Sequence, residues 1–114
     1  MFRNIIQYFN KKNLKDTKYE FLFDKTLNDE YVCFDCETTG LNPKKDDIIS
    51  IGAVIIKNNT IIASKRFVKF VKPKTKLQAD AIKIHHIRVC DLEDAEDINI
   101  VVEEFLNFIG NRTL

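Results

Sequence analysis

Apolar and polar positions follow different spacings along the chain, and each spacing predicts a different kind of element. The first is the three- and four-residue interval of a short amphipathic helix, formed by Phe2, Ile5, Ile6 and Phe9. Residues 11–30 are then rich in Lys, Asn and Asp and have no clear period. We therefore interpret residues 1–30 as an N-terminal extension whose helix docks on another surface.

Three β-prone runs follow and predict consecutive strands at residues 31–34, 48–56 and 60–71. Gly52 and Ala53 lie inside the second run, as expected of a strand in the interior of a sheet. The turn between the second and third runs contains Asn58 and Asn59, and Asn tolerates the positive φ of a tight hairpin turn. The pattern predicts an antiparallel three-strand meander.

Two helices are expected after the strands. Residues 77–84 have a weak helical pattern that ends at His85 and His86. Residues 98–109 have a strong one, with Asp97 placed to cap it and Gly110 to end it. Its apolar stripe consists of Val101, Val102, Phe105, Phe108 and Ile109. Only four residues follow Gly110, so we expect a domain that is interrupted after this helix.

The composition is that of one ordinary domain: 114 residues, 45% hydrophobic and 31% charged, too few for two domains. Eighteen basic and 17 acidic residues leave a net charge of +1. The chain as a whole therefore does not attract nucleic acid by its net charge, and any basic binding surface must be local. No stretch approaches the roughly 20 apolar residues of a membrane span. Polar residues interrupt the N-terminal run where a signal peptide is apolar. We expect a cytoplasmic protein without a membrane partner.

Three cysteines in a chain without an export signal are expected to be reduced thiols. Cys33 and Cys36 have the C-x-x-C spacing of redox and zinc proteins, but they fall in a strand-like run, where residues three apart face opposite sides. Zinc would need two further ligands, for which Cys90 and the adjacent histidines are thin support. We favour structural cysteines and keep a thiol or zinc protein as an alternative.

A candidate metal site lies at the end of the first predicted strand. Asp35 and Glu37 are two positions apart, so their carboxylates project from the same face. Adjacent carboxylates repel each other unless one is protonated or both bind a cation, and hard oxygen ligands suit Mg²⁺ or Mn²⁺. For a bare D-x-E, two acids that face solvent at a strand end are the explanation we favour on these residues alone.

The sequence also contains two runs of like charge. The first is a basic strip without an acidic residue: Lys65, Arg66, Lys69, Lys72, Lys74 and Lys76. It suits phosphate contacts, but we slightly favour the solvent face of an edge strand, where lysines prevent edge pairing. The second is an acidic run, Asp91, Glu93, Asp94, Glu96 and Asp97. We interpret it as a solvated loop or helix start, not as further metal ligands.

The string F-D-C-E-T-T-G-L from Phe34 to Leu41 resembles the first motif of the DnaQ-like family of DEDD-type 3′-to-5′ exonucleases, which includes the proofreading epsilon subunit of bacterial DNA polymerase III. Residues 47–54 resemble the family's second strand, 84–87 its I-H-G-I segment, and the last helix the one before its second catalytic motif. The resemblance covers residues 31–114, about the first half of such a domain. It implies an α/β fold of the ribonuclease H-like type, present in part as the antiparallel meander with covering helices.

The resemblance also implies roles for matching residues. Asp35 and Glu37 would be catalytic ligands of two divalent metal ions, Mg²⁺ or Mn²⁺, at the scissile phosphate. The substrate-binding residues would be Thr38, Thr39, Leu41, Asp80 and His85, of which Asp80 is the weakest match. The substrate would be DNA with a single-stranded 3′ end, and subunits of DNA polymerase III are the partners that the resemblance suggests.

Two departures from the family pattern shape the expected function. His86 stands where the family has Gly, and His enters positive φ less freely, which puts the conformation of that turn in question. The family's other two carboxylates and its general-base His lie beyond the last helix. We therefore expect a metal-dependent 3′-to-5′ exonuclease of proofreading, repair or end processing that is inactive alone as this truncated chain. The alternative is a non-catalytic remnant that binds nucleic acid or a partner. Exposed sheet faces would favour self-association.

Overall fold

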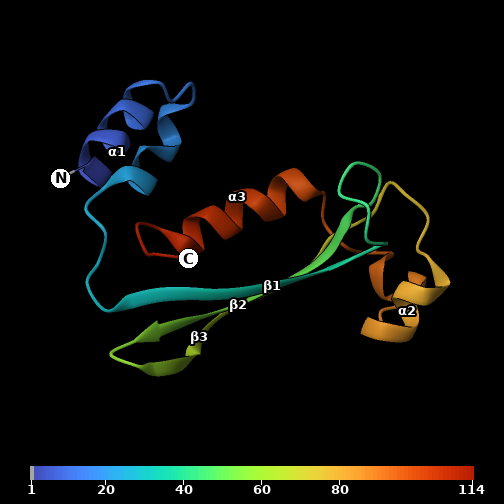
Figure 1. The fold of residues 1–114 in the computed structure, drawn as a ribbon. Helices are drawn as coiled ribbons and strands as arrows, with labels where there is room; N and C mark the ends of the chain where they lie inside the picture. The colour runs from blue at the N-terminus through green and yellow to red at the C-terminus, as the bar shows by residue number, and fades with distance from the viewer. Residues whose placement is uncertain (1) are drawn as a thin grey trace.

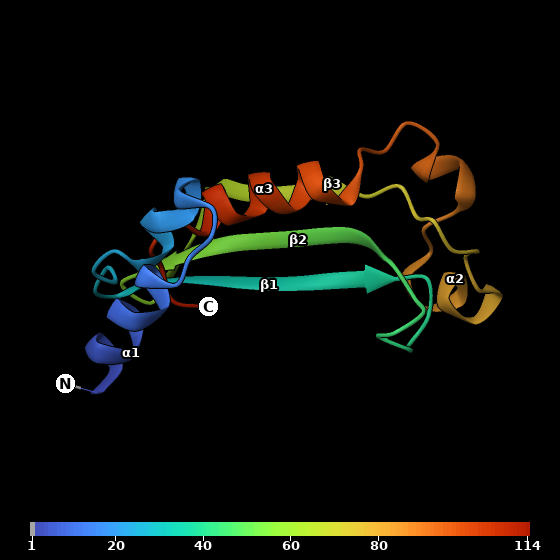
Figure 2. The ribbon, with the colours of Figure 1, turned by 90° about the horizontal axis from the view of Figure 1, so that it is seen from above.

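Three antiparallel strands and a helix along them form the centre of the computed structural model, which describes residues 2–114 and their side chains from Ile5 onward (Figures 1 and 2). The elements in chain order are the helix α1 (Phe2–Lys12), the 3₁₀ helix η1 (Thr17–Phe23), the strands β1 (Glu30–Thr38), β2 (Ile48–Lys57) and β3 (Thr60–Phe70), the helix α2 (Ala79–His85), the 3₁₀ helix η2 (Val89–Leu92) and the helix α3 (Ile98–Ile109). The α/β meander and its helices are confirmed. None of the described helices has the length and apolar character of a membrane span.

The sheet has the order β1-β2-β3, with both pairs antiparallel. The hairpin between β2 and β3 turns through Asn58 and Asn59, whose φ values of 48° and 59° are the positive angles expected of a tight hairpin turn. The edge position of β3 agrees with the expectation for the lysines on it. Lys69 is moreover paired with both Glu96 and Glu104, at 2.9 Å each, so its charge is neutralised within the fold.

The helix α3 covers one face of the sheet, because alternate residues of β2 are buried toward it (Figure 2). Val101 is completely buried, and the Phe105 ring lies 5.4 Å from the rings of both Phe34 and Phe67. The helix begins at Asp97, whose side chain accepts a 2.9 Å hydrogen bond from the Asn99 N–H, and ends at Gly110. Both ends are as the sequence predicted.

The opposite face of the sheet carries no helix among the described residues (Figure 1). Its side chains belong to the residues that alternate with the buried set, and several of them are large and apolar. Tyr31 is 47% exposed, Ile61 61%, Val68 65% and Phe70 42%. This open face agrees with the expectation that apolar surface of the sheet is uncovered.

Within the part of the chain that the structure describes, the free edge of β1 is paired only at its start. The Val32 N–H donates to the Thr113 carbonyl at 2.8 Å, and Tyr31 and Thr113 form a parallel bridge. Arg112 supports this closure, because its Nε donates to the Glu30 carboxylate at 2.9 Å. Backbone groups alternate in direction along a strand, so those of Phe34 and Cys36 also point to this edge, away from β2.

The N-terminal segment forms the expected helix, but the described residues do not cover its apolar stripe. Ile5, Ile6 and Phe9 of the α1 stripe are exposed, and α1 packs against η1. Phe2 of the stripe lies outside the described side chains. The docking of this helix therefore stays a prediction.

Candidate functional site

The two carboxylates of the D-x-E pair lie on the open face of the sheet, near the end of β1. Asp35 is opposite Gly52 of β2, and Glu37 is opposite Ser50. A Cβ added at Gly52 would meet no atom within 4 Å, so the space beside Asp35 is open. Asp35 is exposed and Glu37 is half-buried. The alternation of the strand thus places both acids on one accessible surface, as predicted.

A hollow of about 260 Å³ adjoins this pair, and we call it the site hollow. It lies between the end of β1, the loop that follows and the helix α2. Its lining consists of Glu37, Thr38, Gly40, Leu41, Gln78, Asp80, Ala81, Ile84 and His85. Five of the seven residues named from the sequence therefore meet in one hollow. Asp35 lies on the same strand face as Glu37, and Thr39, which follows Thr38, is completely buried.

His85 presents a buried donor. Its Nδ1 accepts a 3.0 Å hydrogen bond from the Ile87 N–H, which assigns the proton of the neutral ring to Nε2. That Nε2 is buried and has no hydrogen-bond partner among the described residues. A buried donor without a partner is costly, so this atom is suited to meet an acceptor on a bound molecule.

His86, which stands where the family has a glycine, forms the turn after α2. His86 adopts φ 60° and ψ 14°, the left-handed conformation, and its N–H donates to the Ile82 carbonyl at 2.8 Å to end α2. The turn is therefore the one a glycine would make, held here by a residue for which it is strained.

Thr39 is completely buried, and all its polar groups are used within the chain. Its N–H donates to the Asp47 carbonyl at 2.9 Å, its carbonyl accepts from the Gln78 N–H at 3.2 Å, and its hydroxyl accepts from the Asp47 N–H at 2.9 Å. Thr38 is half-buried in the hollow, and its hydroxyl donates to the Gly40 carbonyl at 2.6 Å. Thr39 thus fixes the loop, and a nucleotide contact for either threonine stays a prediction.

Asp47 is a residue of this region that the sequence analysis did not single out. Its Oδ2 accepts hydrogen bonds from the Lys74 N–H at 2.8 Å, the Thr75 N–H at 2.7 Å and the Thr75 hydroxyl at 2.9 Å. The bonds from Thr75 and then from Lys74 hold the pKa of the Asp47 carboxyl below its ordinary value. Asp47 therefore ties the loop after β1 to the segment that leads into α2.

The other two predicted contact residues are accessible. Leu41 is 95% exposed, at the lip of the site hollow, and no packing within the fold explains its size. Asp80 is exposed in the first turn of α2 and forms a 3.4 Å ion pair with Lys83. Its role as a substrate contact stays a prediction.

The donor set fits half of a divalent-metal site. Asp35 and Glu37 supply the hard oxygen ligands that Mg²⁺ and Mn²⁺ prefer, but no group of three or more His, Cys, Asp or Glu side chains that could hold an ion occurs among the described residues. The acidic run does not add to the pair: Asp91 binds Arg88, Glu96 binds Lys69 and Asp97 caps α3.

The cysteines fit neither zinc nor redox chemistry. Cys33, Cys36 and Cys90 are free thiols, and Cys33 and Cys36 occupy positions of opposite facing on β1. Partial burial raises the pKa of the Cys36 thiol, and the charges of Asp35 and Glu37 raise it further, so this thiol is a poor nucleophile.

Comparison with known proteins places the chain in a family. The exonuclease family model RNase_T matches residues 32–114. The PolC-type DNA polymerase III of Mycoplasmopsis pulmonis is 34% identical over 111 residues, which are 97% of this chain and 8% of that protein. The PolC-type enzyme of Clostridium perfringens is 37% identical over 91 residues, 80% of this chain and 6% of that protein. The chain thus spans less than a tenth of these relatives.

Solved structures share the fold. The nuclease domain of 3′hExo, described as a DEDDh family member bound to rAMP, has a TM-score of 0.60 at 22% identity and is matched over 71% of this chain and 44% of its own. Cell-death related nuclease 4 gives 0.63 at 24% identity, over 71% of this chain and 30% of its own. The E. coli ExoI–ssDNA complex gives 0.66 at 16% identity, over 75% of this chain and 20% of its own. These likenesses support a ribonuclease H-like architecture, of which this chain contains a part.

Proposed function

Because this chain belongs to the RNase_T exonuclease family, we propose that it carries the first half of a metal-dependent 3′-to-5′ exonuclease site that acts on the single-stranded 3′ end of DNA. The observation that carries the proposal is the site hollow, where residues from β1, the following loop and α2 meet beside the Asp35–Glu37 pair. These elements are far apart in the sequence, from Glu37 to His85, and the fold brings them together at one accessible place.

Each side chain has a chemistry suited to a nucleotide. Asp35 and Glu37 would hold Mg²⁺ or Mn²⁺, which when bound supplies positive charge at the scissile phosphate and activates water. The His85 Nε2–H would donate to an acceptor of the terminal nucleotide, and the exposed Leu41 side chain would pack against its base. Thr38 would contact the sugar, and Thr39 holds the loop in place through its hydrogen bonds to Asp47 and Gln78.

The chain alone is proposed to be catalytically inactive. Two carboxylates bind a divalent ion weakly, and the described residues bring no third ligand to them. We regard residues 1–30 as an extension and residues 31–114 as the first half of the domain. A partner from the replication machinery would complete it, and DNA polymerase III is supported by the PolC-type relatives. The uncovered sheet face would favour self-association where no partner is present.

The first test is Mn²⁺ binding, followed by the loss of the electron paramagnetic resonance signal of free Mn²⁺. The wild type should bind the ion weakly, and the variant Asp35→Asn/Glu37→Gln should not. A matched control, Glu93→Gln/Asp94→Asn, removes two exposed acids of the acidic run and should bind like the wild type. Equal binding by all three proteins would show that the pair is not the metal site.

The second test is digestion of a primer with a mismatched 3′ end. We expect no release of nucleotides by the chain alone. Release by the wild type and not by Asp35→Asn/Glu37→Gln would contradict the proposed inactivity, and would mean that another copy or other acids complete the site. A non-catalytic binding fragment, the alternative, would bind single-stranded DNA equally well with and without Mn²⁺.

A further inference from the structure

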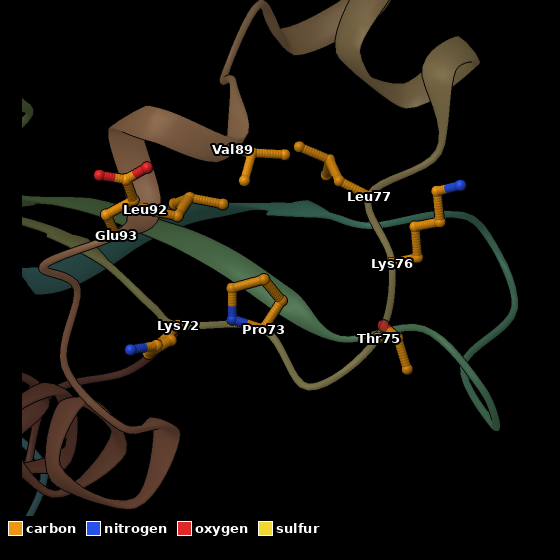
Figure 3. Close-up of a pocket in the computed structure, with 8 residues that line it drawn as sticks. All are labelled: Lys72, Pro73, Thr75, Lys76, Leu77, Val89, Leu92 and Glu93. Atoms are coloured by element: carbon orange, nitrogen blue, oxygen red, sulfur yellow. The ribbon is translucent and has the colours of Figure 1, made fainter.

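A second hollow, of about 380 Å³, lies beside the segment that leads into α2 (Figure 3). Its apolar lining comes from Pro73 and Leu77 on that segment and from Val89 and Leu92 on η2. Figure 3 shows Lys72 and Lys76 at its two ends, with Pro73 between them. We call it the lysine-rimmed pocket. An apolar floor with a positive charge at each end suits a flat apolar group attached to anionic groups on both sides.

The backbone that carries the two lysines is fixed. The Lys72 N–H donates to the Glu96 carbonyl at 2.9 Å, and Asp47 holds the backbone of Lys74 and Thr75. Lys72 and Lys76 themselves are exposed, and neither forms an ion pair with any acid that the structure describes, in contrast to Lys69. Their charges are therefore available to an external anion.

The lysine-rimmed pocket and the site hollow lie along the same stretch of chain. A further hollow of about 610 Å³ lies between them: it shares Thr75, Lys76 and Leu77 with the lysine-rimmed pocket and Gln78 with the site hollow. Lys76 is two residues from Gln78, so their Cα atoms are at most about 7 Å apart along an extended chain. A strand that leaves the site hollow along residues 78 to 72 would therefore pass Lys76 before the pocket.

We propose that the lysine-rimmed pocket binds one base of a single-stranded nucleic acid, upstream of the 3′ end, while Lys72 and Lys76 bind the phosphates on either side. This inference rests on the proposed function, since the strand is the one whose 3′ end lies in the site hollow. The base would be held between Pro73 and Val89 by apolar contact, which accepts any base. The subsite would add affinity without sequence preference.

The lining also contains one acidic residue, which predicts opposite effects of acidic and basic substitutions on binding. Glu93 is exposed and forms no ion pair among the described residues, so its carboxylate opposes the approach of a phosphate. The substitution Glu93→Gln should therefore strengthen binding, whereas Lys72→Ala/Lys76→Ala should weaken it.

The test uses a tryptophan as reporter, because the sequence contains none. Val89 is 65% exposed, so Val89→Trp places the reporter in the pocket with little cost to the fold. Ile61→Trp, on an exposed position of β3 near the hairpin turn, is the control. Addition of a twelve-nucleotide oligothymidylate should quench the emission of Val89→Trp and leave that of Ile61→Trp unchanged. Inorganic polyphosphate, which has the charge but no base, should quench neither.

Affinity gives an independent measurement without a reporter. Loss of two phosphate contacts should reduce the slope of log K against log salt by about 1.4, which is about 25-fold in affinity at roughly 0.1 M salt. We therefore expect this loss for Lys72→Ala/Lys76→Ala by fluorescence anisotropy of a labelled oligothymidylate. The control Lys12→Ala/Lys15→Ala removes two exposed lysines of the N-terminal extension and should bind like the wild type.

Each outcome decides the proposal. Quenching of Val89→Trp alone by the oligonucleotide, with loss of affinity in the Lys72/Lys76 variant alone, supports it. A silent reporter, equal quenching by polyphosphate, or equal losses in both lysine variants overturns it. In the Mn²⁺ experiment, the comparison of the wild type with Asp35→Asn/Glu37→Gln changes no residue of this pocket. A silent reporter beside a positive Mn²⁺ result therefore rejects the subsite alone, and a quenched reporter beside a negative Mn²⁺ result rejects the carboxylate metal site alone.

Discussion

The variant Asp47→Ala should destabilise the fold more than any other exchange of a surface-accessible acid in the chain. It removes one carboxylate oxygen that accepts three hydrogen bonds, two from the backbone N–H groups of Lys74 and Thr75 and one from the Thr75 hydroxyl. A hydrogen bond to a charged group contributes about 1.5–3 kcal/mol where water is excluded and less where water can replace the acceptor. Since the bond from Lys74 is exposed and the two from Thr75 are only partly buried, we expect a loss of about 2–3 kcal/mol in the free energy of unfolding.

The assay is urea unfolding followed by far-ultraviolet circular dichroism at neutral pH, with amide hydrogen exchange at Lys74 and Thr75 as a local readout. In thermal unfolding the same loss corresponds to a decrease of about 10 °C in Tm. Asp94→Ala, at an exposed acid of the acidic run, is the control and should change stability by less than about 0.5 kcal/mol. A loss in Asp47→Ala no larger than that of Asp94→Ala would refute the role assigned to these bonds.

The pH dependence follows from the lowered pKa of the Asp47 carboxyl. A group whose pKa is lower in the folded state stabilises the fold above the ordinary aspartate value of 3.8, and that stabilisation disappears as the pH falls through the folded pKa. The difference between wild type and Asp47→Ala should therefore be complete at neutral pH and shrink below pH 3.8. A difference of undiminished size in strong acid would contradict the assignment to a charged acceptor.

Two further predictions concern the turn after α2 and the thiols. His86→Gly should raise the free energy of unfolding by about 0.5–1 kcal/mol, measured by urea unfolding, because Gly adopts the left-handed φ of 60° without strain; a decrease would show that the imidazole contributes contacts that outweigh the strain. Iodoacetamide at neutral pH should alkylate the exposed Cys33 and Cys90 faster than Cys36, because burial and the charges of Asp35 and Glu37 raise the pKa of the Cys36 thiol. Mass spectrometry of the native chain should find no disulfide. A bridge between Cys33 and Cys36 would disprove that these two side chains face opposite sides of β1.

Elements whose apolar residues follow a regular local pattern could be predicted from the sequence. The apolar run of β2 and the 3.6-residue stripe of α3 predicted both elements, the stripe also predicted the buried face of α3, and Asp97 and Gly110 marked its two ends. The placement of Asp35 and Glu37 on one face needed only the two-residue period of a strand. The 3₁₀ helices η1 and η2 have no such period, and neither was predicted.

The site hollow could not be derived in the same way. Its walls come from loops whose path depends on long-range hydrogen bonds, such as the contact of Thr39 with Gln78 and that of Asp47 with Thr75. Thr39 illustrates the limit: its motif position suggests an exposed contact, whereas the fold buries it completely. The conformation of His86 was also undecidable from residue type alone, because the pull of the helix end outweighs the local preference of His.

The bridge between Tyr31 and Thr113 sets the order in which this chain can assemble as it is synthesised. The β2–β3 hairpin needs only a local turn, and β1 can join it as soon as β2 has left the ribosome. The Glu30–Arg112 contact, in contrast, joins residues 82 positions apart. The nascent sheet therefore carries an open β1 edge, and an apolar face without α3, until residues 98–113 have left the ribosome. During that interval β1 encounters the ribosome exit region or a chaperone, and the arrival of Thr113 closes the start of its edge.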